Sequence, residues 1–336
     1  MRRIWTGILV AVGFFVLILD AKTALNGAVE GLNLCFYTII PALFPFFVLS
    51  IILVSILNGQ QIPFLAPLCR LCHMPVGSGS ILAVGLLGGY PVGAQAVMQA
   101  YNQGQISKGS ARRLLGFCNN AGPAFVFGII GSQFESRTAI WLLWFIHMLS
   151  ALTVGALLPV DFQKDMRLSV SKTLTVSQAM KKALEVTALV CGWVILFRIL
   201  ITFLNRWMLW LLPTQYQVAI YGLLELSNGC CALVSIANSG LRYILCAGIL
   251  SFGGLCVAMQ TTSVTQEIGL GLYFPGKCLQ CLISILLAGV FQMYLFEDCL
   301  PFSVWFAGMI SLLACGIVWM LRRKKKIGSI FAPAAV

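Results

Sequence analysis

One acidic residue, Glu225, lies inside an otherwise apolar stretch and has the clearest capacity for chemistry. It belongs to the sequence GLLELSNG at 222–229, in which Ser227 and Asn228 follow it. An ionisable side chain deep in a membrane is energetically expensive, so such a residue indicates function by default. The carboxylate of Glu225 could bind a proton, a cation or a polar group of a solute. The alternative is a hairpin tip at which Glu225 reaches interfacial water.

The sequence GGYP at 88–91 is a second candidate for solute binding. Glycine is entropically costly in a helix and proline lacks the backbone N–H, so Gly88, Gly89 and Pro91 interrupt a helix. Backbone groups left open inside a membrane need protein, water or ligand partners. Tyr90 adds a hydroxyl group and a stacking face. The alternative is a tight turn between closely packed helices.

Two further apolar segments carry polar breaks that correspond in position. One contains NNAGP at 119–123, where Pro123 removes the hydrogen bond to the carbonyl of Asn119. The other contains SFGGL at 251–255, with Gln260 further along. Amides and hydroxyls there suit a polar, uncharged ligand such as a sugar or nucleoside, and they suit plain interhelical hydrogen bonds equally well. The candidate substrate-binding residues are Gly88, Gly89, Tyr90, Pro91, Asn119, Asn120, Glu225, Ser227, Asn228, Ser251, Gly253, Gly254 and Gln260.

Two short motifs suggest other chemistry, and their context argues against both. CRLCH at 69–73 matches the c-type haem attachment pattern, but we expect it on the cytoplasmic side, whereas haem is attached on the other face. GLYFPGKC at 271–278 nearly matches a P-loop, but it lacks the Ser or Thr that holds magnesium and joins two apolar segments. The sequence offers no convincing Ser-His-Asp, zinc-ligand or paired-carboxylate set. We therefore predict no catalytic residue, no metal, no cofactor and no enzymatic activity.

The composition places these residues in a membrane. Hydrophobic residues make up 60% of the 336 residues and charged residues only 10%, whereas a soluble domain is about a quarter charged. The net charge of +12 arises mainly from bases at the ends of apolar segments, including the run at 322–326, where they act as topology signals. We therefore expect a lipid bilayer and no nucleic acid as partner. The 13 scattered cysteines do not indicate a disulfide framework.

The predicted fold is an all-α integral membrane protein with about eight full transmembrane helices and two re-entrant helical hairpins. The full spans are expected near 4–20, 34–57, 114–132, 137–160, 183–205, 242–262, 277–296 and 302–321. The hairpins are expected near 79–100 and 216–236, where Gly, Pro, Asn and Ser break the apolar run. Re-entry keeps the bases of 108–113 and 161–182 inside, as the positive-inside rule requires. Arg113, Lys277 and both termini then lie on the cytoplasmic face of the cell membrane.

The N-terminal segment has two interpretations. Residues 1–33 are expected to form a transmembrane helix followed by an external loop. Arg2, Arg3, a short apolar run and small residues near 21–24 also resemble a cleavable signal peptide. We favour a retained span, because multi-span proteins commonly start with such a segment.

The same order of predicted membrane elements occurs twice along the chain. Segment 34–160 reads span, hairpin, Gly-rich span, span, and segment 183–296 reads the same way. The basic loop 161–182 joins them, and 297–336 adds a last span and a basic tail. The first unit holds an odd number of full spans, so the two units are predicted to be inverted, as in many secondary transporters. The alternative is an old duplication in a protein that transports nothing.

Five short motifs identify a family resemblance. They are LFPFF at 43–47, GGYPVGA at 88–94, FCNNAGP at 117–123, GLLE at 222–225 and SFGGL at 251–255. They resemble the YlbJ family of sporulation integral membrane proteins over about residues 30–300, and GYPxGA is the most specific part. The resemblance implies a Firmicute plasma-membrane protein with a role in forming the spore and its cortex. It also implies a nucleoside-recognition, or Gate, domain, which is similar to regions of concentrative nucleoside transporters and of the iron transporter FeoB.

The predicted function is a permease for a small polar, nucleoside-like solute that acts in spore formation. A coupling ion such as H⁺ or Na⁺ is compatible with this function. The alternative is a non-transporting membrane component that organises a sporulation complex, with other sporulation membrane proteins or a second copy of the chain as partner. An enzyme acting on lipid-linked wall precursors is a third hypothesis, for which no convergent acid–base set is found.

Overall fold

All regular structure in the described part of the chain is helical. The computed structural model describes residues 2–57, 60, 62–74, 78–160 and 173–301. Five helices there are long and apolar enough to cross a membrane: Ala21–Leu57, Arg137–Leu157, Val176–Trp207, Ser239–Val264 and Tyr273–Leu295. The all-α membrane class is therefore confirmed at this level. The predicted span 302–321, the basic tail and most of the loop 161–182 lie outside the described residues.

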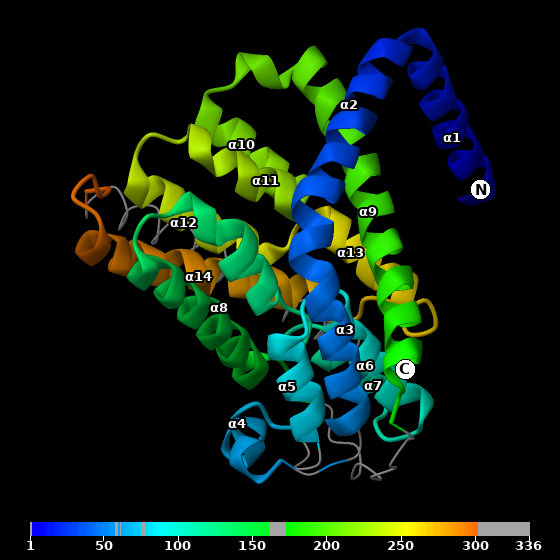
Figure 1. Ribbon diagram of the computed structural model, residues 1–336, viewed down its shortest axis with the longest axis vertical. Helices are drawn as coiled ribbons and strands as arrows, with labels where there is room; N and C mark the ends of the chain where they lie inside the picture. Colours follow the sequence, from blue (N-terminus) through cyan, green and yellow to red (C-terminus); the bar gives the residue numbers. More distant parts are fainter. Residues whose placement is uncertain (1, 58–59, 61, 75–77, 161–172, 302–336) are drawn as a thin grey trace, which may run out of the picture.

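The N-terminal region differs from the prediction. Helix α1 (Arg2–Leu19) ends at Asp20, and the chain turns sharply there into α2 (Ala21–Leu34), as Figure 1 shows. A π-helical turn, η1 (Cys35–Ile39), joins α2 to α3 (Ile40–Leu57). The external loop predicted up to residue 33 is thus wrong, because these residues are helical.

Helix formation at 21–34 has two physical causes. The side chain of Asp20 caps the helix by accepting a hydrogen bond from Thr23 N at 3.2 Å. Gly27 and Gly31 let α2 approach α9 (Val176–Trp207) closely, since a Cβ at either position would lie within 3.0 Å of Ile199 Cα or Ile195 Cα. Small residues at such a seam are typical of helix packing in membranes.

Both predicted hairpins are helix–break–helix elements. The first consists of α5 (Gly79–Leu87) and α6 (Val92–Asn102), and the second of α10 (Thr214–Leu224) and α11 (Leu226–Ala232). The two helices of each hairpin pack against one another. The breaks are GGYP at 88–91 and the single residue Glu225, which has an extended backbone.

The second hairpin depends on a glycine contact, which gives a first prediction. A Cβ at Gly229 would overlap the backbone of Gly222 on the partner helix. Gly229→Ala should therefore destabilise the fold by about 1–3 kcal/mol, as overpacking does, and lower the thermal unfolding temperature in detergent. Gly192→Ala on α9 is the matched control, since a Cβ there has no heavy atom within 4 Å. Equal unfolding temperatures for the two variants would contradict this packing.

The segment predicted as a straight span at 114–132 is broken. Helix α7 (Lys108–Leu114) ends before it, and the chain continues through non-helical residues into the π-helix η4 (Ala124–Ile129) and the 3-10 helix η5 (Ile130–Gln133). Pro123 at the start of η4 lacks the N–H that a continuous helix would need. We call residues 115–123 the first break.

The corresponding segment of the second unit is also interrupted. Helix α12 (Ser239–Phe252) is followed by α13 (Gly254–Val264), and the chain bends at Gly253 and Gly254. Both glycines have positive φ, +81° and +80°, a conformation that glycine adopts without steric cost. We call Gly253 and Gly254 the second break.

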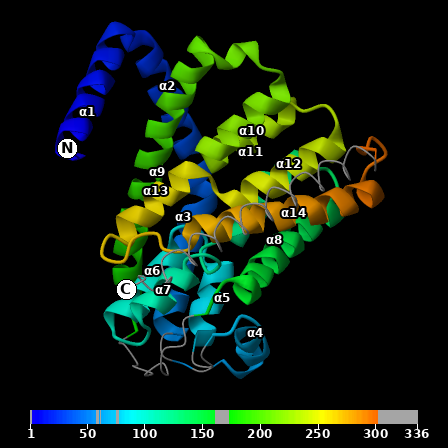
Figure 2. The same ribbon diagram turned by 180° about the vertical axis from the view of Figure 1, so that it is seen from behind.

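The long helices form two groups around these breaks. In one group α2 and α3 run along α9, and in the other α14 (Tyr273–Leu295) packs against α12 and α8 (Arg137–Leu157). The view from behind in Figure 2 shows α13 beside α9, and α13 also packs on α6. Short helices complete the described chain: η2 (Pro63–Leu65), α4 (Ala66–Leu71), η6 (Leu209–Leu211) and η7 (Leu233–Ser235).

Candidate functional site

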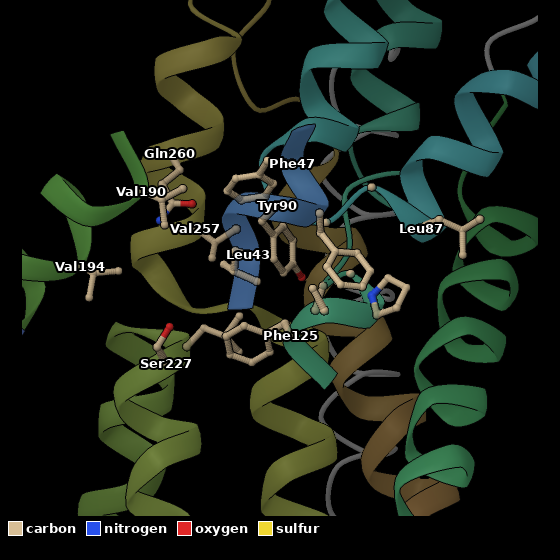
Figure 3. A pocket seen from close by; sticks show the side chains of 18 of the residues that line it. Leu43, Phe47, Leu87, Tyr90, Phe125, Val190, Val194, Ser227, Val257 and Gln260 are labelled. Atoms are coloured by element: carbon tan, nitrogen blue, oxygen red, sulfur yellow. The ribbon is translucent and has the colours of Figure 1, made fainter. Parts of the chain in front are cut away.

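A single small pocket brings together the tips of both hairpins. Gly88, Gly89 and Tyr90 line it from the first hairpin, and Glu225 and Ser227 from the second. Figure 3 shows Tyr90 between Phe47 and Phe125, with Ser227 and Gln260 toward one side. The other lining residues are Leu43, Phe46, Leu87, Ala121, Gly122, Pro123, Ala124, Val190, Val194, Leu226 and Val257.

The pocket is narrow in this conformation. Its free volume is about 40 Å³, which is space for about three water molecules. Apolar side chains of α3 and α9 form one wall, and the polar groups come from the hairpin tips and from Gln260 on α13. A solute larger than a few waters therefore requires the tips to separate.

Glu225 is buried and most of its hydrogen-bonding capacity is already used. It is 1% exposed and caps α11, accepting hydrogen bonds from Ser227 N at 2.9 Å and from Asn228 N at 2.6 Å. The side-chain amide of Asn228 adds a third bond at 2.6 Å. A carboxylate has about four acceptor positions, so about one remains for a ligand.

A chain of polar contacts connects Glu225 to the exposed side chain of Glu30 on α2. Asn228 accepts a hydrogen bond from Arg198 Nη1 at 2.8 Å, and Arg198 Nη2 pairs with Glu30 at 2.7 Å. The Glu30 side chain is 51% exposed. Sequence reasoning did not select Arg198, because an arginine in an apolar helix can also extend its head group to the interface.

The first hairpin tip is held against both breaks. A Cβ at Gly122 would lie 3.0 Å from Gly89 Cα, and one at Gly253 would lie 2.9 Å from Tyr90 Oη. Tyr90 is 7% exposed, and its hydroxyl group has no hydrogen-bond partner among the residues that the structure describes. This hydroxyl therefore has unused hydrogen-bonding capacity next to the pocket and the second break.

Asn119 and Asn120 lie beside the pocket and connect its walls. Asn119 Oδ1 accepts a hydrogen bond from Ala94 N on α6 at 3.2 Å, and its Nδ2 donates to Thr261 Oγ1 on α13 at 3.0 Å. Asn120 Nδ2 donates to Gly85 O on α5 at 2.9 Å. Both asparagines are fully buried. They thus fix the first break to the first hairpin and to α13.

A fully buried lysine, Lys277, lies behind the first hairpin tip. It is 0% exposed and donates to Asn120 Oδ1 at 3.0 Å and to Gln280 Oε1 at 2.8 Å. Its ammonium group is 5.1 Å from the centroid of the Tyr90 ring. Lys277 is therefore not an exposed charge at the membrane surface, because its side chain points into the protein. Arg113, only 5% exposed, is likewise buried and donates to backbone carbonyls.

A polar network extends from Lys277 along α14. Gln280 Nε2 donates to the carbonyl of His147 at 3.3 Å, and His147 Nδ1 lies 3.0 Å from Ser251 Oγ. Ser284 connects Ser251 to Ser150, at 2.6 Å and 2.8 Å. Ser251 thus contributes to the packing of α8, α12 and α14 and does not line the pocket.

The predicted site residues therefore fall into two groups. Those lining the pocket are Gly88, Gly89, Tyr90, Glu225, Ser227 and Gln260. Those in the surrounding framework are Pro91, Asn119, Asn120, Asn228, Ser251, Gly253 and Gly254. The described residues contain no group of three or more His, Cys, Asp and Glu side chains that could hold a metal ion.

One curated protein is similar to most of this chain. It is the sporulation integral membrane protein YlbJ of Bacillus subtilis (strain 168), 26% identical over 327 residues that cover 82% of this chain and 78% of the relative. The chain is a YlbJ homologue. No protein-family model matches the chain, and no solved structure matches it.

The similarity to YlbJ extends over both hairpins. Coverage of 82% leaves about 60 of the 336 residues outside it. The two hairpins lie between Gly79 and Ala232, so a continuous match of that length includes both. The predicted resemblance to the YlbJ family is thereby confirmed, and the homology supports a location in the membrane.

Proposed function

We propose that this protein is a membrane permease of spore formation that binds a small polar solute between its two hairpin tips. The sporulation role is supported by the homology to YlbJ, which is named as a sporulation integral membrane protein. The permease role is supported by one observation above all: both interrupted hairpins and the first break line one small pocket. Interrupted helices that meet at a common site are typical of secondary transporters.

The order of elements supports two inverted units. The sequence α3, hairpin, break, α8 is followed by α9, hairpin, break, α14. We propose that the first unit enters from outside and the second from inside, with both termini cytoplasmic. In this arrangement the units move relative to one another and expose the pocket to each side in turn.

The free polar groups of the pocket suit an uncharged solute with hydrogen-bond donors and acceptors. Glu225 retains about one acceptor position, and the Tyr90 hydroxyl group has no partner. Within the described residues, the side-chain amide of Gln260 donates only to the sulfur of Cys256, at 3.4 Å. Phe47 and Phe125 supply apolar faces. A nucleoside or a sugar combines these properties, and its size requires an open state of the pocket.

Purified protein screened against nucleosides, sugars and wall precursors tests the proposal. A solute that binds the folded state raises the unfolding temperature, by the equivalent of about 2.7 kcal/mol at a concentration of 100 times Kd. We expect at least one class to stabilise the protein and to be taken up by proteoliposomes. Binding without uptake would favour the alternative of a non-transporting component of a sporulation complex. The absence of both would contradict the permease.

A further inference from the structure

Lys277 has an unusual environment for a charged side chain. It is completely buried, yet its two hydrogen-bond acceptors, Asn120 Oδ1 and Gln280 Oε1, are neutral amide oxygens. In the described part of the chain no carboxylate lies within the 4.0 Å that defines an ion pair with it. Burying an ammonium group in such a place costs free energy. A charge retained at this cost indicates a function.

The titratable groups around Lys277 come from three directions. Tyr90 faces it from the first hairpin tip, Cys118 lies on the first break, and His147 on α8 belongs to the same network through Gln280. None of them carries a negative charge at neutral pH in its ordinary form. Among the described residues, the charge of Lys277 is therefore held by dipoles and by an aromatic face, without a counter-charge.

Two contacts of Lys277 lead to the same hairpin. Its ammonium group lies over the ring of Tyr90 at the tip, within the distance at which a cation is attracted to an aromatic face. It also donates to Asn120, which in turn holds the carbonyl of Gly85 on α5. Each of these contacts is stronger with the charged ammonium than with a neutral amine.

We propose that Lys277 is a proton-binding site whose charge holds the first hairpin tip in the closed position. When Nζ releases its proton, the attraction to the Tyr90 ring is lost and the bond to Asn120 weakens, so the tip can move away from the pocket. Rebinding of the proton closes it. The proton-dependent closure of the tip does not depend on the proposed function. Only the use of this proton as the coupling ion of transport rests on that function.

Hydrogen exchange of the first tip, measured without any solute, tests the proposal. The exchange of the amides of residues 88–95 is followed from about pH 5 to about pH 10, with rates corrected for intrinsic exchange. This range includes the pKa values of most buried and exposed lysines. Wild-type protection should fall by about tenfold as pH rises, which corresponds to the loss of one cation–aromatic contact. Lys277→Arg, which stays charged, should show no such fall. Lys277→Met should show low protection throughout.

An exposed lysine elsewhere in the chain provides the control for Lys277. Lys182→Met removes an exposed lysine of α9 and should keep the wild-type profile. A pH-dependent fall in Lys277→Arg, or a flat profile in the wild type, would overturn the proposal even if Lys277→Met does not fold. Failure to find any bound solute would refute the proposed function and leave the exchange result unaffected, so the two failures are distinguishable.

Discussion

Glu225→Gln is expected to weaken solute binding by about 10- to 100-fold while the protein still inserts into the membrane. A hydrogen bond to a charged group contributes about 1.5–3 kcal/mol, and the amide has only one acceptor oxygen. The backbone N–H groups of Ser227 and Asn228 both donate to the carboxylate of Glu225. In the variant, the NH2 group of the glutamine would face one of these N–H groups, and two donors cannot form a hydrogen bond with each other. Impaired capping of α11 should cost about 1 kcal/mol of stability. Binding is measured by thermal shift or calorimetry with the solute found in the screen, and transport in proteoliposomes.

The control for this variant is another glutamate-to-glutamine change in the same chain. Glu267 is exposed between α13 and α14, so Glu267→Gln should bind and transport like the wild type. If Glu225→Gln retains full solute affinity, Glu225 is only a helix cap, and the site assignment fails.

Asn120→Ala is expected to destabilise the protein by about 3–5 kcal/mol. Asn120 is fully buried and makes four hydrogen bonds: it accepts from Lys277 and Gln280 and donates to Gly85 O and Phe117 O. Removing one partner of a buried charge is costly because the charge is left under-solvated. Unfolding in detergent, followed by circular dichroism against added SDS, measures the loss.

Asn205 provides the comparison for Asn120. Its side chain is half-buried and accepts a hydrogen bond from the Tyr221 hydroxyl group at 2.7 Å. Asn205→Ala should cost about 1 kcal/mol, the usual net value of one such bond. If the two variants lose similar stability, the hydrogen bonds of Asn120 to Lys277 and Gln280 do not stabilise the fold more than an ordinary hydrogen bond does.

Much of the site could be predicted because it consists of helix interruptions. Glycine, proline and asparagine in an apolar run interrupt a helix by local chemistry, so GGYP at 88–91 and the glycines at 253–254 were recognised without tertiary information. The carboxylate of Glu225 is predictable as a functional group because a charge inside a membrane is energetically expensive. Most of the predicted residues that line the pocket are helix-interrupting residues or the buried carboxylate of Glu225.

The framework around the pocket could not be predicted, since it depends on contacts between distant segments. Lys277 near a helix end looks like a topology signal, and only the fold shows that it reaches Asn120, which is 157 residues away in the chain. Arg198 and Glu30 are separated by 168 residues. The sequence predicts a loop at the glycines of α2, because their role in packing against α9 depends on the placement of both helices.

The central claim is that one solute contacts both hairpin tips at once. Hydrogen exchange measured with and without the solute identified in the screen tests it directly, on peptides that contain residues 85–95 and 224–232. The account predicts that saturating solute slows exchange in both peptides together. It also predicts that Glu225→Gln needs about 10- to 100-fold more solute to produce either effect, as expected from the loss of one hydrogen bond to a charged group. A solute that stabilises the protein but protects only one tip, or neither, would contradict a shared pocket.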